Sequence, residues 1–184
     1  MDQPKFSPDT EGAGGSTAPS PSLQASDIQR DARTGVPRKV RCEVPLPTAD
    51  AGTDAVRAFL SRNAQQLELS ADEKSLRMIQ DVTTPVRRVV RYQQCHEGIP
   101  IVDRAVVVQV DTAGRVKQMD LSHEPTSMME HIAAPAADGV ATLSPEAALQ
   151  AALRHLDTPA LRMEPGEPQR VYYPTGEQLR LAYQ

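Results

Sequence analysis

The hydrophobic pattern first becomes regular near residue 53, where it predicts a helix. Apolar residues recur on one helical face from there, and either Thr53 or Asp54 can cap the first turn. The helix is expected to end between Leu67 and Ser70. The apolar positions are Val56, Phe59, Leu60, Ala64 and Leu67.

After this helix the pattern changes to the alternation that is typical of strands. Four strands are predicted, at residues 76–82, 86–94, 101–111 and 115–122. The third is expected to be central, because its β-branched valines alternate along a pleated backbone. The residues Asp111-Thr112-Ala113-Gly114 have turn chemistry, with Gly114 free to take a positive φ, so the last two strands are expected to form a hairpin.

A second helix-first pattern begins at Ser144-Pro145-Glu146, which combines a capping hydroxyl, a proline at the first helical position and an early acid. Thr158-Pro159 is expected to end this helix. Strands are predicted at 170–173 and 178–183, and the alternation still continues where the sequence stops. The second unit is therefore expected to be incomplete and the chain to be part of a longer protein. The predicted buried stripe is Leu149, Ala152, Leu153 and Leu156.

The segments outside these units are polar or rich in proline and glycine. Residues 7–26 predict a disordered leader, and the stretch from Asp27 to Asp50 predicts at most one edge strand. The organisation expected is a disordered or extended leader at 1–50, a first unit at 51–124, a connector at 125–141 and a second unit at 142–184.

Composition limits both the core and the class of partner. The chain has 184 residues, 39% of them hydrophobic and only 3% aromatic, so aliphatic side chains must build the core. A net charge of −4 argues against nucleic acid as a partner. No apolar stretch approaches the roughly twenty residues of a membrane span. No secretion signal is recognised, which fits either a cytoplasmic protein or a processed secreted one.

The two cysteines leave their redox state open. Cys42 and Cys95 can pair in an oxidising compartment or remain free thiols, and no CxxC spacing is present.

Two His-Glu dipeptides invite comparison with the zinc motif HExxH, which places two imidazoles on one helical face. Glycine and proline follow His96-Glu97, and proline follows His123-Glu124, so neither can form that helix. Each is interpreted as a surface histidine. No metal site and no cofactor are expected.

Other candidate chemistry is weak. Gly12–Thr17 superficially resembles a phosphate loop but lacks its lysine and its strand–helix context, so a flexible linker is favoured. Turns and solvated strand faces account for the acids, although a hidden acid/base pair stays an open alternative. The basic cluster Arg87, Arg88 and Arg91 beside Tyr92 is interpreted as a solvated strand face or a partner-docking patch, because residues 51–124 balance to zero charge. The acids considered are Glu97, Asp103, Asp111 and Asp120.

The run 90–101, VRYQQCHEGIPI, resembles the signature of the fungalysin/thermolysin propeptide (FTP) domain, in which a strand ending in Arg-Tyr-x-Gln leads through a Gly-Ile/Val-Pro-Val turn. The preceding helix and the following strand and turn occur in the same order in that family. Residues 143–149, 171–174 and 179–183 resemble the PepSY domain that follows it in such precursors.

This resemblance implies a fold and a function. The fold class is α+β, with two small cystatin-like units that each pack a helix on an antiparallel sheet. The function implied is the propeptide region of a secreted thermolysin-like zinc metallopeptidase, acting as intramolecular chaperone and inhibitor. The chain itself would not be an enzyme, and its partner would be the peptidase domain of the same precursor. The localisation implied is secreted or periplasmic.

The motif positions are expected to be structural or partner-docking rather than catalytic. Gly98 and Pro100 would shape the link between two strands, whereas Arg91 and Gln94 would either reach a partner or satisfy backbone groups. A freestanding extracytoplasmic PepSY-type binding or inhibitor module is the main alternative, and a small cystatin-like enzyme is a third. The motif residues are Arg91, Tyr92, Gln94, Gly98, Pro100, Asp111 and Gly114.

Overall fold

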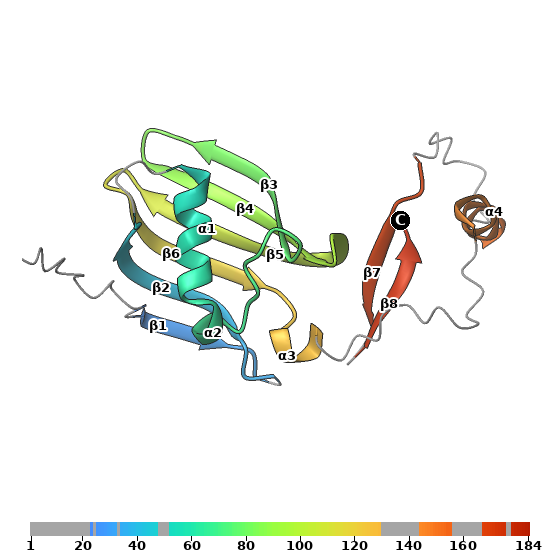
Figure 1. The fold of residues 1–184 in the computed structure, drawn as a ribbon, viewed down its shortest axis with the longest axis horizontal. Coiled ribbons are helices and arrows are strands. Elements are labelled where there is room, and N and C mark those ends of the chain that lie inside the picture. The colour runs from blue at the N-terminus through green and yellow to red at the C-terminus, as the bar shows by residue number, and fades with distance from the viewer. Residues whose placement is uncertain are drawn as a thin grey trace, which may run out of the picture.

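The computed structural model describes residues 23, 25–32, 34–47, 52–129, 144–155, 167–175 and 178–184. It is an α+β fold dominated by a mixed sheet, with few and short helices (Figure 1). The strands are β1 Ala25–Arg30, β2 Pro37–Pro45, β3 Leu76–Thr83, β4 Arg87–His96, β5 Ile99–Asp111, β6 Arg115–Ser122, β7 Arg170–Thr175 and β8 Gln178–Tyr183. The helices are α1 Thr53–Arg62, α2 Ala64–Leu67, α3 Thr126–Met129 and α4 Pro145–His155.

Six strands form an antiparallel platform in the order β1-β2-β6-β5-β4-β3, so β1 and β3 are its edges (Figure 1). The four strands predicted between residues 76 and 122 are confirmed, and their ends differ from the prediction by no more than two residues. The alternating valines correctly predict β5 and its buried face, because Val106, Val108 and Val110 are all buried on one side of the strand.

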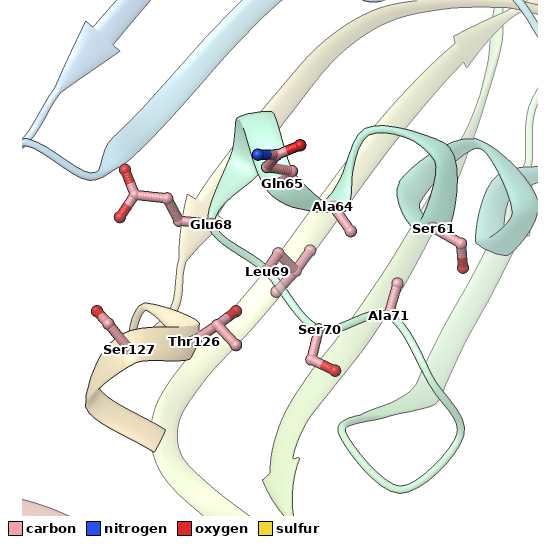
Figure 2. Close-up of a pocket in the computed structure, with 9 residues that line it drawn as sticks. All are labelled: Ser61, Ala64, Gln65, Glu68, Leu69, Ser70, Ala71, Thr126 and Ser127. Carbon is pink, nitrogen blue, oxygen red and sulfur yellow. The ribbon is translucent and has the colours of Figure 1, made fainter. Parts of the chain in front are cut away.

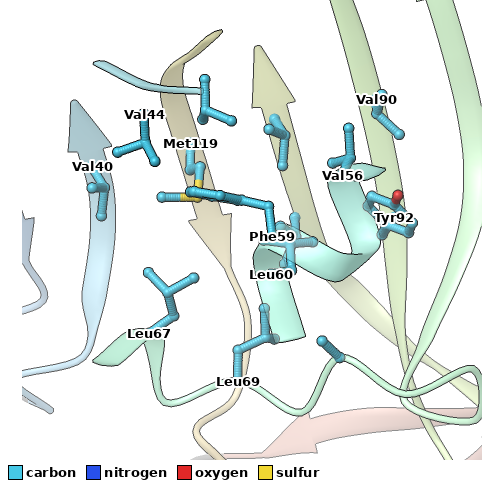
Figure 3. Close-up of a cluster of buried hydrophobic side chains, with 14 of the residues drawn as sticks. Val40, Val44, Val56, Phe59, Leu60, Leu67, Leu69, Val90, Tyr92 and Met119 are labelled. Atoms are coloured by element: carbon cyan, nitrogen blue, oxygen red, sulfur yellow. The ribbon is translucent and has the colours of Figure 1, made fainter. Parts of the chain in front are cut away.

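Helix α1 covers one face of this platform and supplies one side of its core (Figure 3). Val56, Phe59 and Leu60 point from the helix into a cluster with buried side chains of β2, β4, β5 and β6. Its N-cap is Gly52, one residue earlier than expected, and no described side chain makes a capping hydrogen bond there. The capping role predicted for Thr53 or Asp54 is therefore wrong.

The helix also ends earlier than predicted, because Asn63 divides it from the short helix α2. The Asn63 side chain donates a hydrogen bond to the carbonyl of Phe59 at 2.8 Å and accepts one from the amide of Leu23 at 3.2 Å. A side chain that bonds to the backbone of the preceding turn competes with continued helix. The amino-terminal segment thus packs against the end of α1.

The expectation of at most one edge strand before residue 50 is wrong. Two strands form there, and β2 lies inside the sheet between β1 and β6. Val40, Cys42 and Val44 occupy every second position of β2 and are buried in the core. The sequence contains this period-two pattern, although basic residues lie within and before it. Most of the leader expected to be disordered, including Gly12–Thr17, lies outside the described residues.

Strand β5 changes partner along its length. Its later part pairs with β6, whereas Ile101 pairs in parallel with Tyr172 of β7. Asp103, at φ 57°, marks the change. The Gln93 side chain spans this bend by donating to the carbonyls of Ile101 at 2.6 Å and Arg104 at 2.8 Å.

The second unit contains the predicted helix start and two strands. Ser144 caps α4, since its hydroxyl accepts a hydrogen bond from the amide of Ala147 at 3.2 Å. The two strands predicted there correspond to β7 and β8, and these pair with each other in antiparallel fashion. Most of the connector and the end of α4 at Thr158-Pro159 lie outside the described residues, and a cystatin-like packing of α4 on the hairpin stays a prediction.

Candidate docking surface and buried junction

The motif residues Tyr92 and Gln94 of β4 point into the protein rather than outward. Tyr92 is fully buried in the core, with the Arg57 guanidinium 5.3 Å from the centre of its ring. Burial raises the pKa of the Tyr92 hydroxyl. Arg57 also donates to the carbonyl of Leu76 at 2.9 Å, so it ties α1 to β3.

Gln94 makes hydrogen bonds to the protein backbone through both atoms of its side-chain amide. Its amide nitrogen donates to the carbonyl of Glu124 at 2.9 Å, and its amide oxygen accepts from the backbone N–H of the same residue at 2.8 Å. Both groups are buried, so each would be costly without a partner. Gln94 therefore satisfies backbone groups, although they belong to the exit of β6 and not to the Gly98 link.

Glu124 is also held by its side chain. Its carboxylate accepts a hydrogen bond from Nε of Arg104 at 2.6 Å, and this ion pair is largely shielded from solvent. The chain that leaves β6 is thus bound at the same residue to β4 through Gln94 and to β5 through Arg104. We call the cluster of Gln94, Arg104, His123 and Glu124 the junction.

His123 precedes Glu124 in the junction, and the prediction that it is a surface histidine is wrong. It is 1% exposed, and its Nε2–H donates to the carbonyls of Leu67 at 3.0 Å and Glu68 at 3.2 Å. Its Nδ1 is buried and has no hydrogen-bond partner in the described part of the chain. Burial lowers the pKa of His123 to about 4, against the opposing effect of the two carbonyls.

The hairpin residues have the backbone roles that turn chemistry requires. Glu97 and Gly98, at φ 49° and 82°, form the two-residue link between β4 and β5, a geometry typical of a type I′ turn. Pro100 lies just beyond it, in register with Cys95. Asp111 accepts from the amides of Ala113 and Arg115 at 2.9 Å, and Gly114 takes the predicted positive φ.

Charged side chains are distributed differently over the two halves of the sheet face opposite α1. Ion pairs cross the half formed by β1, β2 and β6, including Asp27–Arg41 at 3.6 Å, Lys39–Asp120 at 3.7 Å and Glu43–Lys117. In the basic cluster, Arg87 lies on this face and donates to Gln109 at 3.1 Å. Arg88 alternates with it and lies on the α1 face, where it pairs with Asp81 at 2.6 Å.

Arg91 differs from its neighbours in the basic cluster. It is exposed and has no hydrogen-bond or ion-pair partner among the described residues. It lines an open groove of about 720 Å³ on the same sheet face, together with Gln93, Asp103 and Asp120. The Arg91 side chain is thus accessible from solvent at this groove.

Another open pocket, of about 480 Å³, lies where α2, the loop after it and α3 meet (Figure 2). Its lining is mainly hydroxyl and small apolar side chains, with Glu68 as the one titratable member. An acid/base reaction needs at least two suitably placed groups, so this lining does not provide such a pair.

The described residues contain no group of three or more potential metal ligands. They also include no helix that is both long and apolar enough to cross a membrane.

Cys42 and Cys95 are both free and buried. They lie on β2 and β4, with β6 and β5 between them. Neighbouring strands are about 4.8 Å apart, so these thiols are much farther apart than a disulfide allows. Burial raises the pKa of both thiols, which makes them less reactive.

The platform strands β3 to β6 coincide with a known sequence motif. Residues 75–122 match the Fungalysin/Thermolysin Propeptide Motif. This propeptide motif is typical of the propeptides of fungalysin- and thermolysin-type peptidases, and it contains all seven motif residues named above. Comparison with curated proteins and with solved structures gave no match.

Within the propeptide motif, sequence reasoning missed the residues that hold the bend and the junction. Gln93 occupies the variable position of the Arg-Tyr-x-Gln run, and its hydrogen bonds across β5 depend on the bend at Asp103. Arg104, within β5, and Glu124, just beyond the motif, pair only because β5 and the exit of β6 are adjacent. Their charges carried no local signal of this contact.

Proposed function

We propose that this chain is the propeptide region of a secreted thermolysin-like zinc metallopeptidase, acting as chaperone and inhibitor of the peptidase domain. The observation that carries the proposal is the match of residues 75–122 to the propeptide motif. The match covers β3 to β6 from end to end, so it includes four complete neighbouring strands of the platform.

The surface of the described residues fits a binding role. Arg91 has no ion-pair partner in the part of the chain that the structure describes and lies beside an open groove, and apolar side chains are exposed along β3. A chaperone of this kind works by binding the native peptidase, or the transition state of its folding, more tightly than it binds the unfolded chain. It needs a complementary surface and no reactive group.

The proposal includes the organisation of the precursor. The peptidase domain would follow in the same chain, residues 142–184 would form part of a PepSY domain, and the precursor would be secreted or periplasmic. The junction would then fix the direction in which the chain leaves the motif toward that second domain.

The proposal is tested by refolding a denatured thermolysin-like catalytic domain with and without this chain added in trans. We expect a higher yield of active peptidase, and loss of that activity when the folded chain is added in excess. Val108→Asp, which places a charge in the buried centre of β5, is the control, because the effect should require the folded sheet. Equal recovery with and without the wild-type chain would contradict the chaperone role.

A further inference from the structure

Exposed apolar side chains concentrate on one edge of the sheet. Five large hydrophobic side chains are exposed in the described part of the chain, and four of them lie between residues 78 and 86. This segment comprises the edge strand β3 and the turn that follows it. Concentrated apolar exposure on an edge strand is typical of an interaction site. The four are Met78 at 41% exposure, Ile79 at 48%, Val82 at 42% and Val86 at 73%.

Two exposed arginines lie at or beside this edge. Arg77 and Arg91 are exposed, and neither has a hydrogen-bond or ion-pair partner within the described ranges. The far half of the same sheet face is different, since ion pairs such as Asp27–Arg41 cross it. Arginine binds carboxylates through paired N–H donors, so the near half is complementary to an acidic partner.

The register between β3 and β4 places both arginines on the face away from α1. Arg77 is opposite Gln93, and Arg91 is opposite Gln80, while the intervening Tyr92 points into the core. Met78 is opposite Tyr92 and therefore lies on the α1 face, whereas Val82 lies on the other face. A partner that covers both apolar side chains must run along the edge and cannot rest on one face alone.

We infer that the β3 edge binds an extended segment of the peptidase domain, in which apolar side chains alternate with carboxylates. This inference rests on the proposed function. The segment pairs with free backbone groups of β3, as in strand addition to a sheet edge, in short stretches on either side of the irregularity between Met78 and Gln80. Its carboxylates lie on the side away from α1 and meet Arg77 and Arg91.

The inference is tested with the catalytic domain of a thermolysin-like peptidase as the probe. Its affinity is measured for the wild-type chain and for the double variant Arg77→Glu/Arg91→Glu. The matched control is Arg62→Glu/Arg115→Glu, which changes the net charge equally at exposed arginines on α1 and β6. Circular dichroism establishes that each variant is folded, and Arg77→Gln/Arg91→Gln separates loss of attraction from added repulsion.

We expect the Arg77→Glu/Arg91→Glu variant to bind at least about tenfold more weakly, which corresponds to about 1.4 kcal/mol. The control should stay within about twofold, and the salt dependence of the wild-type affinity should be reduced only in the β3 variant. If the Arg77→Glu/Arg91→Glu variant binds as tightly as the wild type, the inference is overturned and the proposed function is left intact. If the wild-type chain does not bind or rescue the peptidase at all, both fail.

Discussion

Acidification is expected to destabilise this fold through His123. The ring donates from Nε2 to the carbonyls of Leu67 and Glu68, so the neutral form is the one that the site accommodates. Protonation would place a second N–H on the buried Nδ1, which has no acceptor among the described residues. Two nearby side-chain charges oppose each other, since Arg38 lowers the pKa of His123 and Glu124 raises it, and burial dominates both.

The size of the effect follows from the difference between the folded and unfolded pKa values. Burial lowers the pKa of His123 from 6.5 to about 4. At about 1.4 kcal/mol for each pKa unit, the protonated ring costs the folded state about 3 kcal/mol. The unfolded chain binds this proton below pH 6.5 and the folded chain only near pH 4. The free energy of unfolding should therefore fall between these two values and lose nothing further from His123 below pH 4.

Urea unfolding measured at intervals from pH 7.5 to pH 4 checks this prediction. His123→Gln retains a side-chain N–H donor but cannot titrate, so it should lose about 1 to 2 kcal/mol at pH 7.5 through poorer packing. Its free energy of unfolding should then fall by about 3 kcal/mol less than that of the wild type as the pH decreases. Parallel pH profiles for the two proteins would refute the reasoning, as would a folded-state pKa near 6.5 in an NMR titration of the ring.

Two further substitutions test the turn and the junction by urea unfolding at neutral pH. Gly98→Ala should lower the free energy of unfolding by about 1 to 2 kcal/mol, because a φ of 82° is strained for alanine. An added Cβ would meet no atom within 4 Å, so the cost is backbone strain and not a clash. Gly98→Asn should cost less, because asparagine adopts positive φ more readily. A neutral Gly98→Ala would show that the turn relaxes. Gln94→Leu should cost about 2 to 4 kcal/mol by leaving two buried groups of Glu124 unpaired. The control Gln80→Leu, on the exposed edge, should change little, and equal losses would exclude the junction as the cause.

The strands and turns of the motif could be predicted from the sequence because their signals are local. Alternating valines specify β5, and Asp111 with Gly114 specifies the turn into β6, whatever the rest of the chain does. The same holds for α4, where Ser144 caps the helix within a few residues of itself. Each depends on contacts between near neighbours in the sequence.

The place of β2 inside the sheet, and the end of α1 at Asn63, depended on more than local pattern. Val40 and Val44 have the spacing of one strand face, but the basic run Arg38, Lys39 and Arg41 around Val40 favours a solvated segment. Burial followed from pairing with β6, more than seventy residues away. Asn63 ended the helix because its side chain bonds both to the preceding turn and to Leu23.

The sequence by itself determined which residues form β3 to β6, where the hairpins turn, and which surface residues carry charge. Only the tertiary structure decided that His123 is buried and that Gln94 binds the backbone of Glu124. It also decided that Arg77 and Arg91 lie beside an apolar edge without a partner among the described residues. The physical reason is that burial and pairing are properties of groups brought together from distant positions. Strand alternation needs only a residue and its immediate neighbours.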